Sequence, residues 1–196
     1  MTKKLAVTGE EKMILTNYFP LIKRISNKDG LRGMVIEVWV RLWRDSGYRD
    51  ITEAPNSLTE YDGDDDIVRH TNVVARMASA IAAELERAYG VNPDYDLLLA
   101  GALLHDVDKL VLFERKGDSV QVGELGKKVP HGQYGALIAE KIGLPREVVN
   151  IIASHSPINP MASPETIEAV IVAFCDEVSF QSYRFITGQG LLKKKS

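Results

Sequence analysis

The clearest apolar periodicity in the chain begins just after the acidic run at residues 62–66. Positions at i, i+3, i+4, i+7, i+8 and i+11 are occupied in turn by His70, Val73, Val74, Met77, Ala78 and Ile81. This spacing predicts a helix from about Asp66, with one apolar stripe turned toward a core. Because His70 belongs to that stripe, we expect its imidazole to point inward.

The segments before this helix are predicted to be mostly helical. Thr8 is a candidate N-cap for a helix through about Ser26, and Glu11 completes a capping box. Residues 30–46 favour a helix, although Val-Ile-Glu-Val-Trp-Val also alternates as a strand would. Residues 47–66 contain Gly, Pro, Asn and Ser, which is typical of an exposed connection.

The second half of the chain favours further helices. Residues 95–112 contain LLLAGALLHDVDKLVLF, and a helix this apolar must be buried on most sides. Its internal charges therefore need partners. Residues 115–129 carry three glycines among charges and predict a loop with a short hairpin around 120–122. Helices are expected again at about residues 131–142, 145–154 and 164–187. The predicted fold class is all-α.

Composition narrows the class of protein. The chain has 196 residues, of which 45% are hydrophobic, and this is enough for one compact core. A net charge of −3 gives no general attraction for nucleic acid or anionic membranes. Cys175 is the single cysteine, so an internal disulfide and a CxxC zinc site are excluded. Without a signal peptide or an 18-residue apolar run, a soluble cytoplasmic protein is expected.

The candidate chemistry lies in the histidines and two aspartates. The set, with successive steps of 35, 26, 24 and 21 residues, is His70, His105 with its neighbour Asp106, His131, His155 and Asp176. Imidazole nitrogens and carboxylate oxygens ligate Zn, Fe, Mn, Ni and Co, and one carboxylate can bridge two ions. A single histidine is more often an ordinary core or surface residue. Together, the six residues favour a metal site.

These residues resemble a known family. The pattern H70…H105-D106…D176, with HDVDK at 105–109, is similar to the HD superfamily of metal-dependent phosphohydrolases over residues 65–185. The resemblance implies an HD-domain helical bundle at 63–187. It does not explain the first 60 residues; we expect residues 1–62 to form a helical N-terminal extension packed on that bundle, and residues 188–196 to form a flexible basic tail. The additional His131 and His155 resemble the two-metal branch of the superfamily.

The resemblance also implies roles for single residues. Two divalent transition-metal ions, chosen among Fe, Mn, Zn, Ni and Co, are expected as cofactors. The first ion would be held by His70, His105, Asp106 and Asp176, and the second by Asp106, His131 and His155. Asp106 would bridge the ions, and Lys109 would contact phosphate or the attacking hydroxide, so both are expected to be catalytic. Asp108 is left with two alternatives: pairing near Lys109 or holding a ligand histidine.

The leading functional hypothesis is a phosphohydrolase that acts on a nucleotide or other small phosphate ester through a metal-activated water. Its partner would be a small phosphorylated substrate, with no specific nucleic acid and no membrane, and a homodimer is left open. A mixed-valence di-iron oxygenase of a small organic substrate would use the same ligands. A metal-stabilised binding module without catalysis is a third alternative. The Gly-Tyr-Pro signature of the cyclic-dinucleotide branch is absent after His155.

Overall fold

The computed structural model describes residues 6–26, 28–58, 65–117, 119–156 and 162–191. The helices are α1 Gly9–Tyr18, α2 Leu31–Asp45, α3 Ile67–Tyr89, α4 Tyr95–Leu104, α5 Lys109–Leu112, α6 Gln133–Ile142, α7 Arg146–Ser154 and α8 Ile167–Ile186. Short 3-10 helices are η1 Pro20–Arg24, η2 Lys28–Gly30 and η3 Ile51–Glu53. The strands β1 Phe113–Lys116 and β2 Ser119–Val122 form one antiparallel hairpin. The all-α prediction is confirmed, and a hairpin is present, although it begins at residue 113, before the loop predicted at 115–129.

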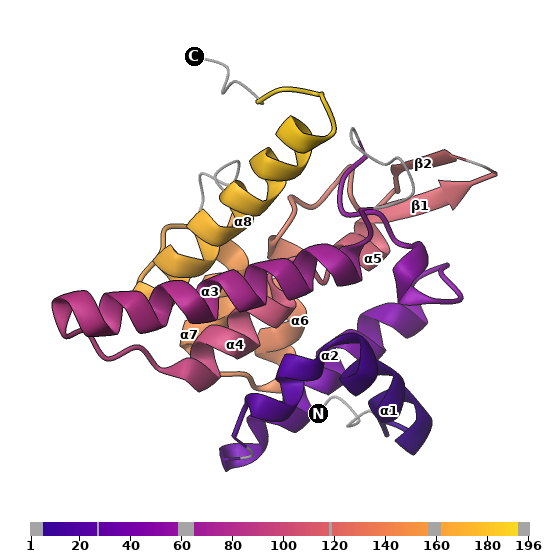
Figure 1. The fold of residues 1–196 in the computed structure, drawn as a ribbon. Helices are drawn as coiled ribbons and strands as arrows, with labels where there is room; N and C mark the ends of the chain where they lie inside the picture. Colours follow the sequence, from indigo (N-terminus) through magenta and orange to yellow (C-terminus); the bar gives the residue numbers. More distant parts are fainter. Residues whose placement is uncertain (1–5, 27, 59–64, 118, 157–161, 192–196) are drawn as a thin grey trace.

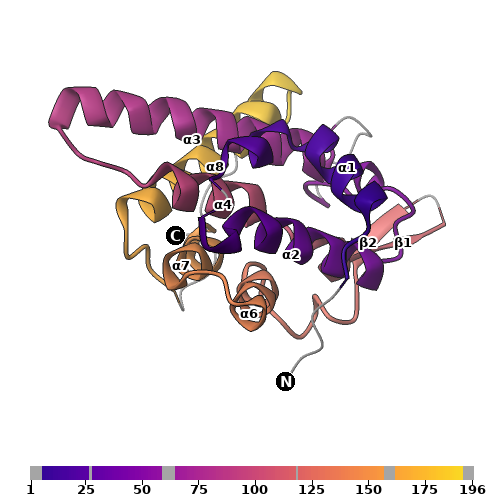
Figure 2. The ribbon, with the colours of Figure 1, turned by 90° about the horizontal axis from the view of Figure 1, so that it is seen from below.

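Helix α4 forms the centre of the molecule. It packs against α2, α3, α7 and α8, and its residues 98–104 are all buried. Figures 1 and 2 show α3 and α8 on one side of it and α2, α6 and α7 on the other sides. Gly101 allows the approach of α7, because a Cβ atom there would lie 2.5 Å from Cγ2 of Ile151. The apolar surroundings predicted for this segment are therefore supplied by four helices.

Helix α3 begins where the sequence predicted. The side chain of Asp66 accepts a hydrogen bond from the backbone N–H of Arg69 and caps the helix. His70 and Ala78 are buried, as the stripe predicts, but Ile81 is 38% exposed and Ala82 is buried in its place. The last turns of α3 project past the helices that cover it, so the stripe prediction is wrong at Ile81 (Figure 1).

The N-terminal segment departs from its prediction in length. The Thr8 and Glu11 capping box is present, but α1 ends at Tyr18 instead of continuing to Ser26. Pro20 lacks the N–H that an α-helix would use, and the chain continues as η1 instead. Helix α2 confirms the helical interpretation of residues 30–46.

The connection before α3 is less exposed than predicted. Ile51 and Ala54 are fully buried. Asn56 donates its backbone N–H to the carbonyl of Asp65 at 2.9 Å, and Ile67 donates to the carbonyl of Ala54 at 2.9 Å. This short antiparallel pairing ties the connection to the start of α3. The predicted boundary at residues 62–63 lies outside the described residues, so the division into extension and bundle stays a prediction.

The segment 95–112 is not one helix. Helix α4 ends at Leu104, turns occupy 105–108, and α5 begins at Lys109. The backbone N–H groups of Val107 and Lys109 donate to carbonyls three residues back. This tighter winding turns successive side chains by about 120° instead of about 100°. No helix in the described part of the chain is long and apolar enough to cross a membrane.

Candidate metal centre

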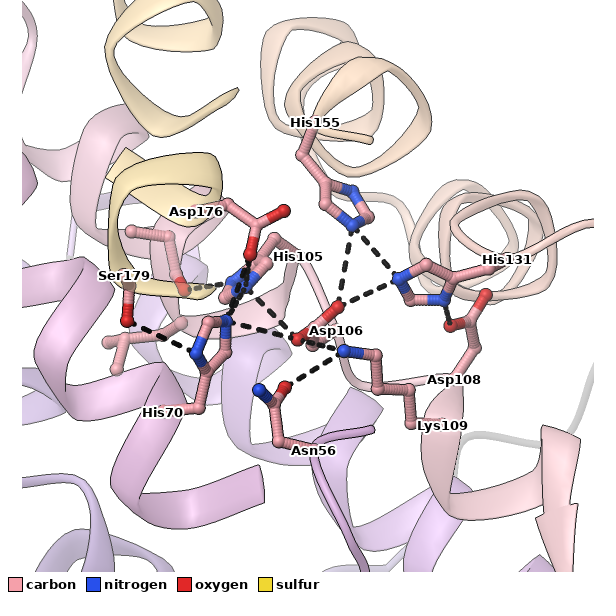
Figure 3. Close-up of polar contacts among 12 residues, drawn as sticks. Asn56, His70, His105, Asp106, Asp108, Lys109, His131, His155, Asp176 and Ser179 are labelled. Atoms are coloured by element: carbon pink, nitrogen blue, oxygen red, sulfur yellow. Dashed lines mark hydrogen bonds and ion pairs between the residues drawn. The ribbon is translucent and has the colours of Figure 1, made fainter. Parts of the chain in front are cut away.

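The six predicted metal ligands converge on one interior point (Figure 3). They come from α3 (His70), the turn after α4 (His105 and Asp106), the turn before α6 (His131), the end of α7 (His155) and α8 (Asp176). Most of their side chains are buried, but 28% of His131 and 16% of Asp176 are accessible to solvent. The contact distances divide them into two groups that share Asp106.

The first group surrounds one oxygen of Asp106. Its Oδ2 lies 3.4 Å from Nε2 of His70 and 3.3 Å from Nε2 of His105. The two imidazole Nε2 atoms are 3.4 Å apart. Oδ1 of Asp176 completes the group at 2.9 Å from Nε2 of His70. Four donor atoms on two helices and one turn thus face a common point.

The second group surrounds the other oxygen. Oδ1 of Asp106 lies 2.8 Å from Nε2 of His131 and 3.4 Å from Nε2 of His155. The Nε2 atoms of these two histidines are 3.0 Å apart. Asp106 therefore presents one oxygen to each group, which is the arrangement that a bridging carboxylate requires.

The outer ring nitrogens fix which nitrogen faces inward. Nδ1 of His105 lies 2.8 Å from the carbonyl of Ala102, and Nδ1 of His155 lies 2.7 Å from that of Ile152. A carbonyl only accepts, so both Nδ1 atoms carry the proton, and a neutral ring then presents a lone pair at Nε2. Nδ1 of His70 is held less closely, 3.3 Å from Oγ of Ser179.

The spacing of the inward atoms fits a metal ion. Two lone pairs about 3 Å apart repel unless a positive charge, either a proton or a metal ion, lies between them. Ligands at about 2.1 Å from one ion are separated by about 3.0 Å at right angles and about 3.4 Å at the tetrahedral angle. The two Nε2–Nε2 separations, 3.0 and 3.4 Å, have these values. The donor set and its spacing therefore suit a divalent transition metal.

Asp108 holds the ring of His131 from behind. It is fully buried, and its Oδ1 lies 2.8 Å from Nδ1 of His131. Its Oδ2 accepts the backbone N–H groups of Gly132 at 2.8 Å and Gly135 at 3.1 Å. Of the two roles left open by the sequence, the contact with a histidine of the site is the one observed.

Gly132 is required by the close fit beside His131. Its φ of +84° is in the left-handed region. A Cβ atom there would also lie 2.9 Å from the carbonyl oxygen of Ile152 and 3.3 Å from the His155 ring. A side chain at residue 132 would therefore push apart two histidines of the second group.

Lys109 reaches the same carboxylate. Its Nζ lies 2.6 Å from Oδ2 of Asp106 and donates to Oδ1 of Asn56 at 2.9 Å. Lys109 was predicted as a site residue, whereas Asn56 and Ser179 were not. Asn56 lies in a segment whose composition resembles that of a loop, and Ser179 carries no motif. The sequence offered no local signal for either residue.

The charges inside the site keep the carboxylates ionised. Burial alone would raise the pKa of Asp106, but the ammonium of Lys109 and the ring of His105 hold it well below the usual range. Burial also opposes ionisation of Asp176, yet the hydrogen bond from His70 and the histidine charges lower its pKa to about 2. Both carboxylates are therefore in the form that binds a cation.

The two histidines of the second group differ in their preferred protonation state. Burial lowers the pKa of His155, which favours the neutral ring. Burial acts in the same direction on His131, but the carboxylates of Asp108 and Asp106 outweigh it and raise the pKa to about 9. Without a metal, His131 therefore carries the proton that a cation has to displace.

Comparison with known families agrees with this geometry. The HD domain family matches residues 67–181, which is more than half of the chain. The chain belongs to the HD domain family. HD domains bind divalent metals, and the two groups of His and Asp side chains are suitable donors. Asn56 and the rest of the N-terminal segment lie before the matched region.

Two kinds of curated relative are similar to this HD domain. A dihydroneopterin 2′,3′-cyclic phosphate phosphodiesterase from Methanocaldococcus jannaschii is 35% identical over 130 residues, covering 65% of this chain and 51% of the relative. Ribonuclease Y from Desulforudis audaxviator is 34% identical over 113 residues, 58% of this chain and 18% of the relative. The chain thus spans about half of the first relative and under a fifth of the second. No solved structure shows a significant match.

Proposed function

We propose that this chain is a metal-dependent phosphohydrolase that cleaves a phosphodiester bond in a small, nucleotide-like substrate. The observation that carries the proposal is the position of Asp106, whose two oxygens face separate donor groups beside the ammonium of Lys109. The relatives support the reaction class, since one is named a cyclic phosphate phosphodiesterase and the other Ribonuclease Y. A small substrate is favoured over long RNA because the chain has a net charge of −3.

The cofactor proposal is two divalent transition-metal ions per chain. One would be held by His70, His105, Asp106 and Asp176, and the other by Asp106, His131 and His155. Such ions lower the pKa of a bound water and neutralise negative charge on phosphoryl oxygens. Asp106 would contribute one oxygen to each ion, and the burial of His105 and His155 would keep bulk water from competing for them.

The solvent-accessible members of the site indicate where the substrate approaches. Side-chain accessibility is 28% for His131, 16% for Asp176 and 13% for Lys109, against 2% or less for the remaining ligands. A phosphate entering on this side meets the Lys109 ammonium, which has three N–H groups. An ammonium already held in a partly dry site stabilises developing charge on a phosphoryl oxygen.

The oxygenase alternative uses the same ligand set, and no relative named above supports it.

Four further expectations stay predictions. They are the absence of specific nucleic-acid binding, the cytoplasmic location, the homodimer and the role of residues 1–62 as an extension.

The test begins with protein purified without oxygen and loaded separately with Fe(II), Mn(II), Co(II), Ni(II) or Zn(II). Hydrolysis of 2′,3′-cyclic AMP, 3′,5′-cyclic AMP and bis(p-nitrophenyl) phosphate is then measured with and without a chelator. We expect metal-dependent cleavage of at least one diester. If no loaded form hydrolyses a diester and the protein instead consumes oxygen with an organic substrate, the oxygenase alternative replaces the phosphohydrolase.

Lys109→Ala is the variant that probes the residue proposed to contact the phosphoryl group. It should lower turnover by about 100-fold, the scale of one electrostatic contact in a transition state, and leave most of the metal content. Lys127→Ala is the matched control, because Lys127 is exposed and pairs with Glu124 away from the centre. Equal activity of the two variants would show that Lys109 has no role in the reaction.

A further inference from the structure

Asn56 connects the segment before the HD domain to the metal centre. It lies eleven residues before the matched region begins, at residue 67. It is 1% exposed, and its Oδ1 accepts a hydrogen bond from Nζ of Lys109 at 2.9 Å (Figure 3). A buried amide oxygen without a hydrogen-bond donor would destabilise the fold, and the Lys109 ammonium is its donor here.

Asp65 fixes which way the Asn56 amide points. Nδ2 of Asn56 donates to Oδ2 of Asp65 at 2.9 Å, and its backbone N–H donates to the Asp65 carbonyl at 2.9 Å. A flipped amide would place its NH₂ group against the Lys109 ammonium and its oxygen against the Asp65 carboxylate. Both contacts would then be repulsive, so Asp65 keeps the amide oxygen directed at Lys109.

Two acceptors hold the Lys109 ammonium in one position. Oδ2 of Asp106 lies 2.6 Å from Nζ, and Oδ1 of Asn56 lies 2.9 Å from it. A lysine side chain is a flexible stem that ends in three rotating donors, and a single acceptor leaves the ammonium free to turn about that contact. A second acceptor, on a different chain segment, restricts this rotation and gives the third N–H a fixed direction.

We propose that Asn56 is a positioning residue for Lys109, oriented by Asp65, so that the segment before the HD domain contributes to the reaction. This inference rests on the proposed function, because it assigns Lys109 to the phosphoryl group. Small displacements of a charged group in such a site reduce turnover while leaving substrate binding nearly unchanged.

The first experiment is a double-mutant cycle in metal-loaded protein. Asn56→Leu, which has nearly the same volume, should lower kcat at least 10-fold and change KM less than 3-fold, with metal content unchanged. In a Lys109→Met background the same substitution should lower kcat less than 2-fold, because Asn56 acts through the lysine. An equal loss in both backgrounds, or no loss in the first, would overturn the proposal.

The control variant is Thr52→Val. Thr52 lies in η3 of the same segment, and its hydroxyl donates to Asp50 and not to the site. Its kcat should stay within 2-fold of the parent protein. If Asn56→Leu does not fold, Asn56→Ala replaces it with the same expected results. A Thr52→Val protein as impaired as the Asn56 variants would assign the effect to loosening of the segment and overturn the proposal.

A second readout does not depend on hydrolysis. In zinc-loaded, ¹⁵N-labelled protein, NMR measures how fast the Lys109 ammonium protons exchange with water. We expect at least 5-fold faster exchange in Asn56→Leu and unchanged exchange in Thr52→Val. If the parent protein cleaves no diester, the proposed function fails, and this exchange rate still decides whether Asn56 holds Lys109. Equal rates in the two variants would contradict the positioning role.

Discussion

The Oδ1 atom of Asp108 lies 2.8 Å from Nδ1 of His131, so the opposite nitrogen of that ring faces Asp106. Asp108→Asn should weaken binding of the ion held by His131 and His155 by about 10- to 100-fold, as is usual for the partners behind ligand histidines. The other ion should be retained. Metal competition against a chelator measures this, with the exposed Glu124→Gln as control. Identical metal affinities in the two variants would show that Asp108 does not support metal binding.

Metal binding should release a proton from His131. Its pKa, raised to about 9, keeps the metal-free ring charged at every pH below that value. Binding at pH 7.5 therefore displaces close to one proton from this residue, and the release disappears above about pH 9. Calorimetry in buffers of different ionisation enthalpy measures the number of protons. The Asp108→Asn variant should release fewer, because it removes one of the carboxylates that raise this pKa. Heats that do not depend on the buffer would contradict the assignment.

The packing of α4 on α7 can be tested at Gly101. In Gly101→Ala the new methyl would lie 2.5 to 2.8 Å from three atoms of Ile151, so the two helices must separate. We expect a loss of about 1–3 kcal/mol in unfolding free energy, typical of an overpacked core. Gly33→Ala in α2 is the control: apart from its chain neighbours and the backbone of its own helix, no atom lies within 4 Å of its added Cβ, and alanine favours a helix. Thermal unfolding should therefore place the two variants on opposite sides of the parent protein.

The sequence predicted the starts of the helices well wherever apolar periodicity or capping was strong. The Thr8 capping box, the start of α3 and the hairpin at 113–122 all have local causes. The break in the helix at 105–108 has no such local cause. The apolar pattern of α4 continues after the break, so the pattern itself does not mark where the helix ends. Periodicity alone does not distinguish an α-helical turn from the tighter turn found here.

The candidate ligands were visible in the sequence because each is a polar residue within or beside an apolar segment. Asn56 was missed for the opposite reason. It lies among Pro, Ser and Asp residues, where an asparagine is ordinarily a turn residue. Its contact with Lys109 joins positions 53 residues apart and depends on the pairing of residues 54–56 with 65–67. A tertiary contact of this kind is not indicated by the local composition of the sequence.

Among the described residues, Asp106 alone presents an oxygen to each donor group, and metal content is the most direct test of this bridging role. Elemental analysis should find close to two ions per chain in the anaerobically loaded parent protein. Asp106→Ala should bind almost none, and His155→Ala should retain close to one, because His155 is a donor in the second group and not in the first. Circular dichroism checks that each variant is folded. An Asp106→Ala protein that still binds two ions per chain would contradict the account.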